Sequence, residues 1–265
     1  LNRVYSEDVT MIAADFRNEK IETILPNLYN LIFSKVKFVD MYRIYEDIFD
    51  RIPLSLVKHS WFLEHISGSA QKGYDVLKRG MDIILSLILS IPSLVIFPFV
   101  YIAIKIEGSG DVFFFQERIG KNNKHIRLIK FRSLAMHNSP DGIAKEPTPT
   151  IVGKFLRKTR IDELPQLWNV LKGDLSLIGP RPEIPTLALL YEKEIPYYNI
   201  RHLIKPGLSG WAQLYQNLPP KWGMGVNETR IKLSYDLYYI KNRSLLVDLK
   251  IALRTIKTLL SREGV

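Results

Sequence analysis

Cysteine is absent from this chain of 265 residues. Its absence excludes disulfide frameworks, Cys-ligated zinc, iron–sulfur clusters and thiol nucleophiles. Histidine is scarce, and its five copies lack the spacing of metal ligands, so we assign them no catalytic role. They are His59, His65, His125, His137 and His202.

A secretory leader is also missing, because no charged start followed by an apolar stretch and a small-residue cleavage site is visible. The first residue is Leu1 and not Met. We therefore expect a piece of a longer chain.

Acidic residues are outnumbered, with 27 Asp and Glu against 37 Lys and Arg and a formal net charge of +10. This excess indicates an anionic partner such as phosphate, nucleotide, nucleic acid or an anionic bilayer. Hydrophobic residues make up 46% of the chain, enough for the core of one large or two modest domains, so global disorder is excluded.

Charge is missing from one long apolar run, Ile83–Ile104. As a helix the run would be about 33 Å long, enough to cross a hydrocarbon core of about 30 Å. Lys78 and Arg79 precede it and Lys105 follows it, so the positive-inside rule favours the cytoplasmic side for both ends. At the membrane edge, Asp82 follows Arg79 by three positions, a spacing that predicts an ion pair on one helical face.

Two prolines interrupt this run, Pro92 and Pro98. Each removes a helical hydrogen bond and costs about 3 kcal/mol in a plain helix, so we expect a kink near Pro92. Ser86, Ser90 and Ser93 surround that point and could bond the carbonyls that a bend frees. Two topologies stay open on these residues: a kinked helix that spans the membrane, and a re-entrant hairpin with both ends on one side.

Residues 1–66 read as a small α/β piece. Val9–Ala14 and Val36–Val39 are strand-like, and Asn18–Ser34 between them has helical spacing. The pattern predicts a βαβ fragment without the Gly-rich turn of a nucleotide site. Ser67–Gly73 forms a natural linker into the apolar run.

A basic stretch follows the run, with six Lys and Arg and no acid from Arg118 to Arg132. Ile126–Phe131 alternates in polarity and predicts a strand. We expect Lys130 and Arg132, which flank Phe131, to form an edge that faces a substrate phosphate. For Lys121 and Lys124, contact with lipid headgroups is an equal alternative.

The most informative segment contains the adjacent acids Asp162 and Glu163. Asp162 stands at an expected N-cap, Pro165 fits the first helical turn, and Gly173 fits the helix end. A helix that starts at the pair would offer free amides to a phosphate. The plain alternative is that Asp162 only caps the helix and Glu163 only complements its dipole.

Arginines surround this pair in the sequence. Arg157 and Arg160 lie within one turn upstream, so carboxylates and guanidiniums converge as a Mg²⁺-assisted phosphoryl-transfer site requires. Downstream, Arg181 stands between Pro180 and Pro182, which fix the backbone beside it. A pre-ordered guanidinium loses less entropy on clamping a phosphate; a plain structural turn is the alternative.

Five sequence motifs, which follow one another in a fixed order along the chain, resemble those of a known family. They are Lys130-Phe-Arg-Ser133, Asp162-Glu-Leu-Pro-Gln166, Gly179-Pro-Arg-Pro182, Lys205-Pro-Gly-Leu-Ser-Gly-Trp-Ala-Gln213 and Tyr235-Asp-Leu-Tyr-Tyr-Ile240. From about residue 72 to 262 the chain resembles the bacterial sugar transferases, which are monotopic polyprenyl-phosphate sugar-1-phosphate transferases. Residues 1–66 resemble the end of the Rossmann-like domain in the large members of that family.

The resemblance implies transfer of a hexose 1-phosphate from a UDP-sugar to undecaprenyl phosphate, with release of UMP, as the first membrane step of exopolysaccharide, capsule or O-antigen synthesis. It implies Asp162 as the nucleophile of a covalent aspartyl phospho-sugar, Glu163 as its partner in handling Mg²⁺, and Lys130, Arg157 and Arg181 as phosphate contacts. Arg160 stands where many members have serine, so its phosphate role rests on its position alone. The resemblance also favours the re-entrant hairpin, with Ser90, Pro92 and Pro98 at its bend.

Near the end, residues 244–262 predict a basic amphipathic helix. It carries Lys250, Arg254 and Lys257 on one face and Leu245, Leu249, Ile256 and Leu260 on the other. The helix could lie on the membrane surface or pack on the catalytic core with a solvated basic face. Asp248 falls toward the apolar side, so we expect a buried partner for it.

The fold class expected is α+β and mostly helical: a membrane-associated catalytic domain with a re-entrant membrane helix, preceded by a partial Rossmann-like α/β fragment. The expected boundaries are 1–66 for the fragment, 67–77 for a linker, 78–106 for the membrane helix and 107–265 for the cytosolic catalytic domain. The protein is expected at the bacterial inner membrane, with the catalytic domain on its cytoplasmic face. Expected partners are a UDP-sugar, undecaprenyl phosphate and the membrane; a homo-oligomer is left open.

Three other functions fit parts of the sequence. A membrane-tethered nucleotide-sugar-binding regulator would explain the charge and the anchor but not the acidic pair between arginines. A glycosyltransferase would release UDP and would normally carry a DxD-like metal motif, which the sequence lacks. Nucleic-acid binding is not expected, since no helix-turn-helix or aromatic RNA motif accompanies the charge.

Overall fold

The computed structural model describes residues 9–16, 18–66, 71–135, 148–216 and 225–261. It divides into two compact units, Leu1–Glu64 and His65–Val265, each described by itself below. Residues 67–70 of the predicted linker and His137 lie outside the described residues.

The first unit contains a parallel βαβ arrangement, as predicted. Strands β1 (Met11–Ala14) and β2 (Lys37–Asp40) pair in parallel. The single helix expected between them is instead three short pieces, α2 (Glu19–Glu22), α3 (Leu25–Tyr29) and η1 (Asn30–Ser34). Pro26 explains the first break, because it has no N–H to donate to the carbonyl four residues earlier. The wider likeness of this unit to a Rossmann-like domain stays a prediction.

Helices α4 (Met41–Phe49) and α5 (His59–His65) follow the second strand. Asp40 caps α4 by accepting a hydrogen bond of 2.8 Å from the Tyr42 amide. The buried side chains of this unit include Leu31, Ile52 and Trp61.

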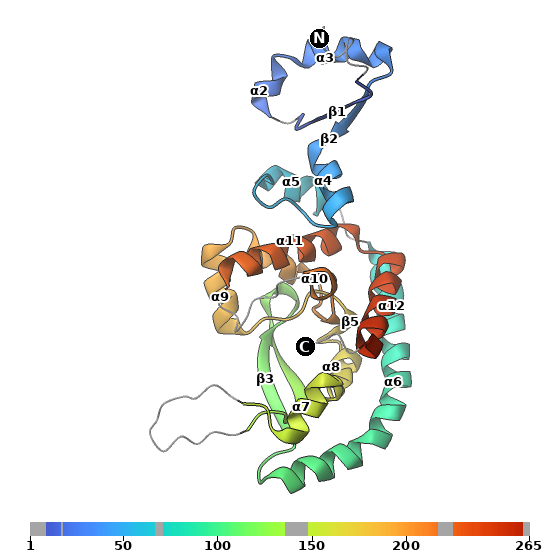
Figure 1. Ribbon diagram of the computed structural model, residues 1–265, viewed down its shortest axis with the longest axis vertical. Helices are drawn as coiled ribbons and strands as arrows, with labels where there is room; N and C mark the ends of the chain where they lie inside the picture. The colour runs from blue at the N-terminus through green and yellow to red at the C-terminus, as the bar shows by residue number, and fades with distance from the viewer. Residues whose placement is uncertain (1–8, 17, 67–70, 136–147, 217–224, 262–265) are drawn as a thin grey trace. The chain divides into compact units, whose positions relative to one another are not determined.

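The second unit is mostly helical with two small two-stranded sheets, in agreement with the predicted fold class. It begins with the long helix α6 (Lys72–Glu107), followed by the antiparallel hairpin of β3 (Phe113–Ile119) and β4 (His125–Phe131), joined through η2 (Lys121–Asn123). The elements that follow are α7 (Ile151–Lys158), η3 (Ile161–Glu163), α8 (Gln166–Lys172), β5 (Ser176–Ile178), α9 (Pro185–Glu194), η4 (Tyr198–Leu203), β6 (Gly207–Ser209), α10 (Trp211–Tyr215), α11 (Val226–Asn242) and α12 (Leu245–Ser261). Strands β5 and β6 pair in parallel, and α8 lies between α6 and the β3–β4 hairpin (Figure 1).

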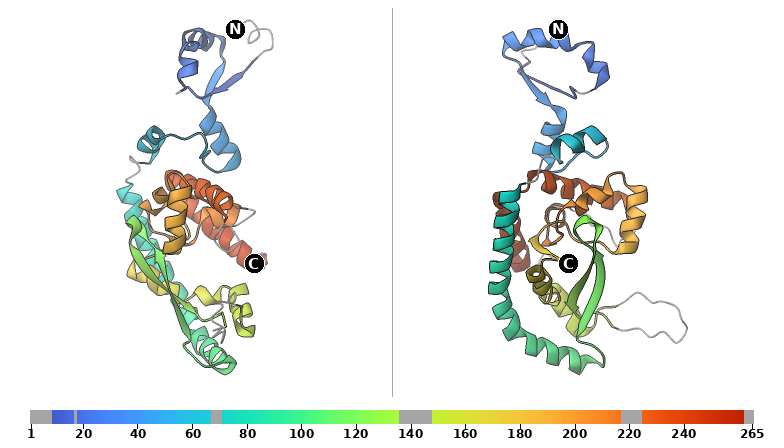
Figure 2. Two further views of the ribbon diagram at one scale, coloured as in Figure 1. Left: turned by 90° about the vertical axis from the view of Figure 1, so that its left-hand side faces the viewer. Right: turned by 180° about the vertical axis from the view of Figure 1, so that it is seen from behind.

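Helix α6 is one continuous helix of 36 residues that contains both prolines and is apolar and long enough, by length and composition, to cross a membrane. It is longer than the predicted 78–106. The ribbon bends along its length, as Figures 1 and 2 show. The Ser90 hydroxyl donates to the Ser86 carbonyl at 2.7 Å. A serine beside the bend therefore does bond a helix carbonyl. The carbonyl that Pro92 leaves without a helical donor belongs to Ile88 and is not the one that Ser90 bonds.

The amino-terminal part of α6 is bonded to the backbone of other elements of the second unit. The Arg79 guanidinium donates to the carbonyls of Val170 and Leu171, both at 2.6 Å, and the Asp82 carboxylate accepts from the Leu177 amide at 3.0 Å. The predicted Arg79–Asp82 ion pair is therefore wrong. Few helical donors remain for the carbonyls at the end of α8, and the buried Asp82 carboxylate already accepts from the Leu177 amide, so each residue bonds to backbone and not to the other.

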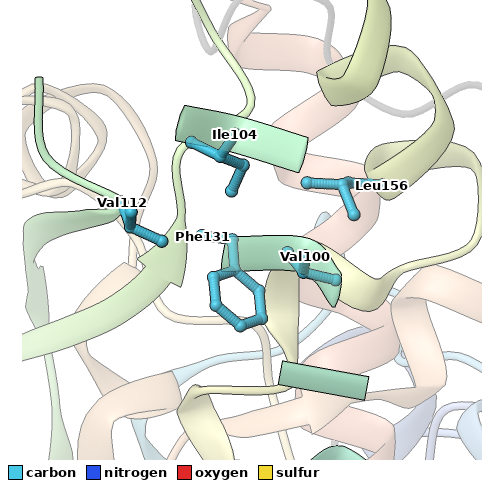
Figure 3. Packing of buried hydrophobic residues seen from close by; sticks show 5 residues of the cluster. All are labelled: Val100, Ile104, Val112, Phe131 and Leu156. Atoms are coloured by element: carbon cyan, nitrogen blue, oxygen red, sulfur yellow. The ribbon is translucent and has the colours of Figure 1, made fainter. Parts of the chain in front are cut away.

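The carboxyl-terminal part of α6 is anchored to the same unit by apolar packing (Figure 3). Val100 and Ile104 of α6 are buried in one cluster with Val112, Phe131 of β4 and Leu156 of α7. The Phe131 ring also stacks on Phe113 at a centroid distance of 5.5 Å. Both ends of the apolar run therefore contact one compact unit.

Helix α12 packs on α10, β5 and β6 with Ile251 fully buried. Its basic residues Lys250, Arg254 and Lys257 are exposed, as predicted. Lys250 also lies over the Trp211 ring and Arg254 over the Tyr215 ring, 4.9 and 4.1 Å from the centroids. The helix also carries an apolar stripe of exposed side chains: Leu246, Leu249, Leu253 and Ile256. The packing alternative is therefore confirmed in its contact with the core and in its exposed basic face, and contact with the membrane surface stays open.

Asp248 of α12 has the buried partners that its position predicted. Its carboxylate accepts hydrogen bonds from the Lys78 ammonium at 2.7 Å, the Tyr74 hydroxyl at 2.8 Å and the Tyr239 hydroxyl at 2.7 Å. This group ties α12 and α11 to the start of α6.

Candidate functional site

The acidic pair lies in a single turn of 3-10 helix, η3, directly before α8. Glu163 N–H donates to the Arg160 carbonyl and Leu164 N–H to the Ile161 carbonyl, 3.1 Å each. Pro165 has no N–H to continue this ladder, so α8 begins only at Gln166. The prediction that Asp162 caps α8 and that Pro165 lies in its first turn is therefore wrong, whereas Gly173 does end α8, in a left-handed conformation with φ of 95°.

Two of the helix amides near the acidic pair are bonded within the chain. The amides of Leu167 and Trp168 donate to the carbonyls of Leu164 and Pro165 at 3.0 and 3.1 Å. These two donors are therefore not free for a phosphate, and the wider phosphate site at this helix start stays a prediction.

Glu163 is held by two of the predicted cations. Its Oε1 accepts from Arg181 Nη2 at 2.7 Å and from Lys130 Nζ at 3.2 Å. Burial alone would raise the pKa of Glu163, but Arg181 and Lys130 outweigh it and lower this pKa to about 2. Glu163 is therefore ionised throughout the physiological range.

Asp162 is the contrasting member of the pair. Its side chain is buried, with the residue 8% exposed, and its Oδ1 has no hydrogen-bond partner among the described residues. Burial and the neighbouring Glu163 raise the pKa of Asp162, while Lys130, Arg160 and Arg157 act in the opposite direction. A poorly solvated carboxylate surrounded by cations is a stronger nucleophile than one in water, because less hydration must be removed before it attacks.

Arg157 and Arg160 contribute to this site through charge. Both are exposed, and within the described ranges neither side chain makes a hydrogen bond or ion pair. Arg160 has φ of 58°, in the left-handed region, and this residue turns the chain from α7 into η3. Their guanidiniums are thus free for an anionic substrate.

Arg132 does not belong to this group. Its guanidinium donates to the carbonyls of Ile104, Gly108 and Ser109 at 3.1, 2.8 and 2.7 Å, and so caps the end of α6. The predicted substrate contact of Arg132 is therefore replaced by a structural role. Successive strand residues face opposite sides, but Arg132 lies just past the end of β4, where that alternation gives no guidance.

A second charged group, unforeseen in the sequence, holds the backbone of Arg181. The Arg201 guanidinium donates to the Arg181 carbonyl at 2.8 Å and pairs with Asp236 at 2.8 Å, and Arg118 donates to the Pro182 carbonyl at 3.1 Å. Arg201 and Asp236 are almost completely buried. The available signal was a lone acid inside the otherwise apolar and aromatic motif Tyr235–Ile240.

The close approach of β5 and β6 fixes the same segment. A Cβ on Gly207 would collide with the Gly179 backbone, and a Cβ on Gly179 would lie 2.6 Å from the Lys205 carbonyl oxygen. Only glycine fits at these two positions. The backbone before Arg181 is therefore fixed by the packing of Gly179 on β6, and the carbonyls of Arg181 and Pro182 are fixed by hydrogen bonds from Arg201 and Arg118.

Glu183, which follows this segment, makes the free energy of unfolding depend on pH. Burial alone would raise its pKa, but Lys232 and Arg201 lower it to about 2. A lowered folded-state pKa stabilises the protein above the ordinary value near 4.5, and this contribution is lost as the pH falls toward 2. Between pH 6 and pH 3 we expect the free energy of unfolding to fall by about 2 kcal/mol more in the unmodified protein than in Glu183→Gln. Chemical denaturation at several pH values measures the difference; equal slopes would contradict the assignment.

The pair also has the donor chemistry for a divalent cation. Mg²⁺ is bound in proteins through one or two carboxylates and completes its shell with water and substrate phosphates. The unpartnered Asp162 Oδ1 and the Glu163 carboxylate match that requirement. The described residues contain no cluster of three or more His, Cys, Asp or Glu that could hold a metal by itself, so the fit is to a metal shared with a phosphate ligand.

The second unit, called the catalytic unit below, is similar in sequence to known transferases. A family model described as bacterial sugar transferase matches residues 73–262. The chain is 45% identical over 199 residues to the UDP-N-acetylgalactosamine-undecaprenyl-phosphate N-acetylgalactosaminephosphotransferase of Aeromonas hydrophila, across 72% of this chain and 45% of that protein. It is 36% identical over 195 residues to the exopolysaccharide production protein PSS of Rhizobium leguminosarum bv. phaseoli, across 71% of this chain and 96% of that protein.

A further relative is named for the transfer of glucose 1-phosphate. The UDP-glucose:undecaprenyl-phosphate glucose-1-phosphate transferase of Escherichia coli is 35% identical over 185 residues, across 68% of this chain and 39% of that protein. The match thus spans less than half of the Aeromonas and Escherichia relatives and nearly all of the Rhizobium one. Since the family model covers well over half of the chain, this protein belongs to the bacterial sugar transferase family.

Proposed function

We propose that this protein transfers a hexose 1-phosphate from a UDP-sugar to undecaprenyl phosphate and releases UMP. The observation that carries the proposal is the buried, unpartnered Asp162 carboxylate beside a Glu163 that is locked by Arg181 and Lys130. The printed names of the Aeromonas and Escherichia relatives describe transfers of this class.

The reaction runs in two displacements on one phosphorus. An Asp162 oxygen attacks the β-phosphorus of the UDP-sugar, the bond from that phosphorus to the bridging oxygen breaks, and UMP leaves with the electron pair. The phosphate oxygen of undecaprenyl phosphate then attacks the same phosphorus and frees the Asp162 carboxylate. Arg157, Arg160 and Arg181 offset the charge of the diphosphate and of the leaving UMP.

Glu163 orients the cations and does not attack. Its bonds to Lys130 and Arg181 fix both side chains beside Asp162. Mg²⁺ bound by Asp162 and Glu163 would supply further neutralisation of the diphosphate. Glu163 stays charged at any working pH and so can serve both purposes.

The arrangement of α6 supports a re-entrant membrane helix. A straight span of the apolar run would separate its ends by about the thickness of a bilayer core. Arg79 and Asp82 before the run, and Val100 and Ile104 at its end, all contact the catalytic unit instead. The bend at Ser90, Pro92 and Pro98 would then lie in the membrane, with the catalytic unit on the cytoplasmic face of the bacterial inner membrane.

The exposed apolar stripe of α12 fits the same placement. Leu246, Leu249, Leu253 and Ile256 recur at spacings of three and four residues and form one face. A helix of this kind buries its apolar face at the headgroup boundary. Contact of α12 with the membrane surface is therefore part of the proposal.

Cysteine labelling tests the topology, since the chain has no cysteine of its own. Gln71 and Ser109 are exposed at the two ends of α6. In separate Gln71→Cys and Ser109→Cys variants, we expect a membrane-impermeant maleimide to label both sites in inside-out vesicles and neither in intact spheroplasts. Lys124→Cys, in the catalytic unit, is the orientation control. Labelling of the two sites from opposite sides would show a straight span.

A substrate panel tests the activity. Purified protein with undecaprenyl phosphate and Mg²⁺ is supplied with UDP-glucose, UDP-N-acetylgalactosamine or UDP-galactose, and UMP and lipid product are measured. We expect UMP release, dependent on the lipid phosphate for repeated turnover, with at least one of these donors. Release of UDP would indicate a glycosyltransferase, and binding without any release would indicate a nucleotide-sugar-binding regulator.

A further inference from the structure

A cavity of about 240 Å³ lies in the catalytic unit beside the first turns of α6. Its lining includes Tyr74, Lys78, Arg79, Lys121, Lys205 and Tyr239. Arg79 binds the carbonyls at the end of α8, whereas the acidic pair lies just before the start of α8. The cavity is thus separated from Asp162 by the length of α8, on the order of 10 Å, and belongs to no part of the proposed reaction.

Some of the charge in this cavity is already compensated. Lys78 pairs with Asp248 at 2.7 Å, and Arg243 pairs with Asp75 at 3.0 Å. Arg79 donates to two backbone carbonyls, which leaves its full positive charge in place.

Lys121 and Lys205 are the other two cations in the lining of the cavity. Neither ammonium has a hydrogen-bond or ion-pair partner in the part of the chain that the structure describes. Lys205 Nζ and Arg79 Nη2 converge on Gly173, since each lies within about 3.5 Å of the point where a Gly173 Cβ would be. Burial, Arg79 and Lys121 lower the pKa of Lys205, and Asp82 and Asp174 offset this effect only in part. Asp82 also lines the cavity, with its carboxylate bonded to the Leu177 amide at 3.0 Å, so Arg79, Lys121 and Lys205 remain in excess over the one lining acid that has no cationic partner.

We propose that this cavity binds a phosphate ester. Two unpaired ammoniums and one guanidinium around a hollow form a set of convergent donors, and a phosphate accepts several such hydrogen bonds at once. The volume is below the range typical of drug-sized ligands, so it suits a phosphate with its nearest substituents rather than a whole nucleotide sugar. Two phenol rings, of Tyr74 and Tyr239, provide an apolar wall.

The ester could come from the bilayer or from solution, and the chemistry is the same. Lys78 and Arg79 stand four to five positions before the apolar run Ile83–Ile104, so a phospholipid headgroup can reach the cavity at the membrane edge. A soluble phosphate can enter from the aqueous side. The site would hold this anion while Asp162 and its neighbours act on another.

Site-resolved lysine acetylation tests the proposal on the full, unmodified chain. Protein in maltoside micelles is treated briefly with an amine-reactive acetylating reagent, and each lysine is quantified by mass spectrometry. One arm adds inorganic phosphate against chloride of equal ionic strength. A second arm compares bilayers of phosphate-free digalactosyldiacylglycerol with the same bilayers containing phosphatidylglycerol.

We expect acetylation of Lys205 and Lys121 to slow by roughly threefold or more at saturating probe. Lys124, one short turn from Lys121 but outside the cavity lining, is the internal control and should not change. Protection by inorganic phosphate identifies a site open to solution, and protection by phosphatidylglycerol alone identifies a lipid headgroup site. No protection in either arm, or equal protection of Lys124, overturns the proposal.

Matched variants separate this cavity from the reaction centre. In Lys205→Gln we expect the protection of Lys121 to be lost, whereas in Lys124→Gln it should persist. Lys130 in the same digests reports on the acidic pair, so a UDP-sugar that protects Lys130 but not Lys205 would support the proposed function alone. Unchanged protection of Lys121 in Lys205→Gln would contradict a shared phosphate site.

Discussion

Asp162→Asn should reduce UMP release by at least about 10³-fold, because the amide cannot form the covalent bond to phosphorus that the proposed reaction requires. The substitution keeps the shape of the side chain. Burial raises the pKa of Asp162, so its charge is unfavourable in the folded protein, and the variant should have an unchanged or higher Tm. UMP release and thermal unfolding of the same preparation measure the two effects.

Asp111→Asn is the matched control, since it makes the same chemical change at an exposed position before β3. Its UMP release and its Tm should equal those of the unmodified protein. Turnover of Asp162→Asn within tenfold of the control would remove Asp162 from the role of nucleophile. A large loss of Tm in Asp162→Asn would mean that the residue acts structurally.

Asp236→Asn should destabilise the protein strongly, because it removes the nearer of the two carboxylates that pair with the buried Arg201 and leaves only Glu183 at 3.8 Å. Breaking one side of a buried ion pair costs about 3–5 kcal/mol, which for a unit of this size corresponds to a fall in Tm of about 10 °C. UMP release should also fall, since Arg201 holds the carbonyl of Arg181. Thermal unfolding and initial rates measured well below the transition give both numbers.

Two further variants show which part of this effect is structural. Asp174→Asn breaks an ion pair of 3.0 Å with Lys172, whose side chain is 63% exposed, and should cost no more than about 1 kcal/mol. The double variant Arg201→Met/Asp236→Leu replaces the buried pair by apolar side chains and should recover much of the stability. It should not recover UMP release, because the Arg181 carbonyl still lacks its donor. Full recovery of the rate would show that Arg201 has no positioning role.

Local features of the fold were predictable from the sequence because they depend on neighbours along the chain. The apolar run Ile83–Ile104 with two prolines specifies a long bent helix by itself. Gly173 ends α8 because only glycine adopts its backbone conformation readily. The proximity of Asp162 and Glu163 to cations was equally visible, since Arg157 and Arg160 lie within a few residues.

The different surroundings of the two acids, Glu163 ion-paired and Asp162 unpartnered, were not predictable from the sequence. The sequence places Asp162 and Glu163 side by side and gives no reason why one should be locked and the other free. Lys130 and Arg181 come from β4 and from the segment after β5, and both reach Glu163. Asp162 is left buried and unpartnered only because those two long-range contacts go to its neighbour.

The sequence by itself determined the family motifs and their order, the apolar run, and the types of residue available for phosphate chemistry. Only the tertiary structure decided the partners: Arg132 caps α6 instead of facing substrate, and Arg79 binds the end of α8 instead of Asp82. The physical reason is that helix ends leave carbonyls without donors, and a guanidinium satisfies whichever of these the fold brings within reach. That proximity joins residues tens of positions apart, and no local pattern encodes it.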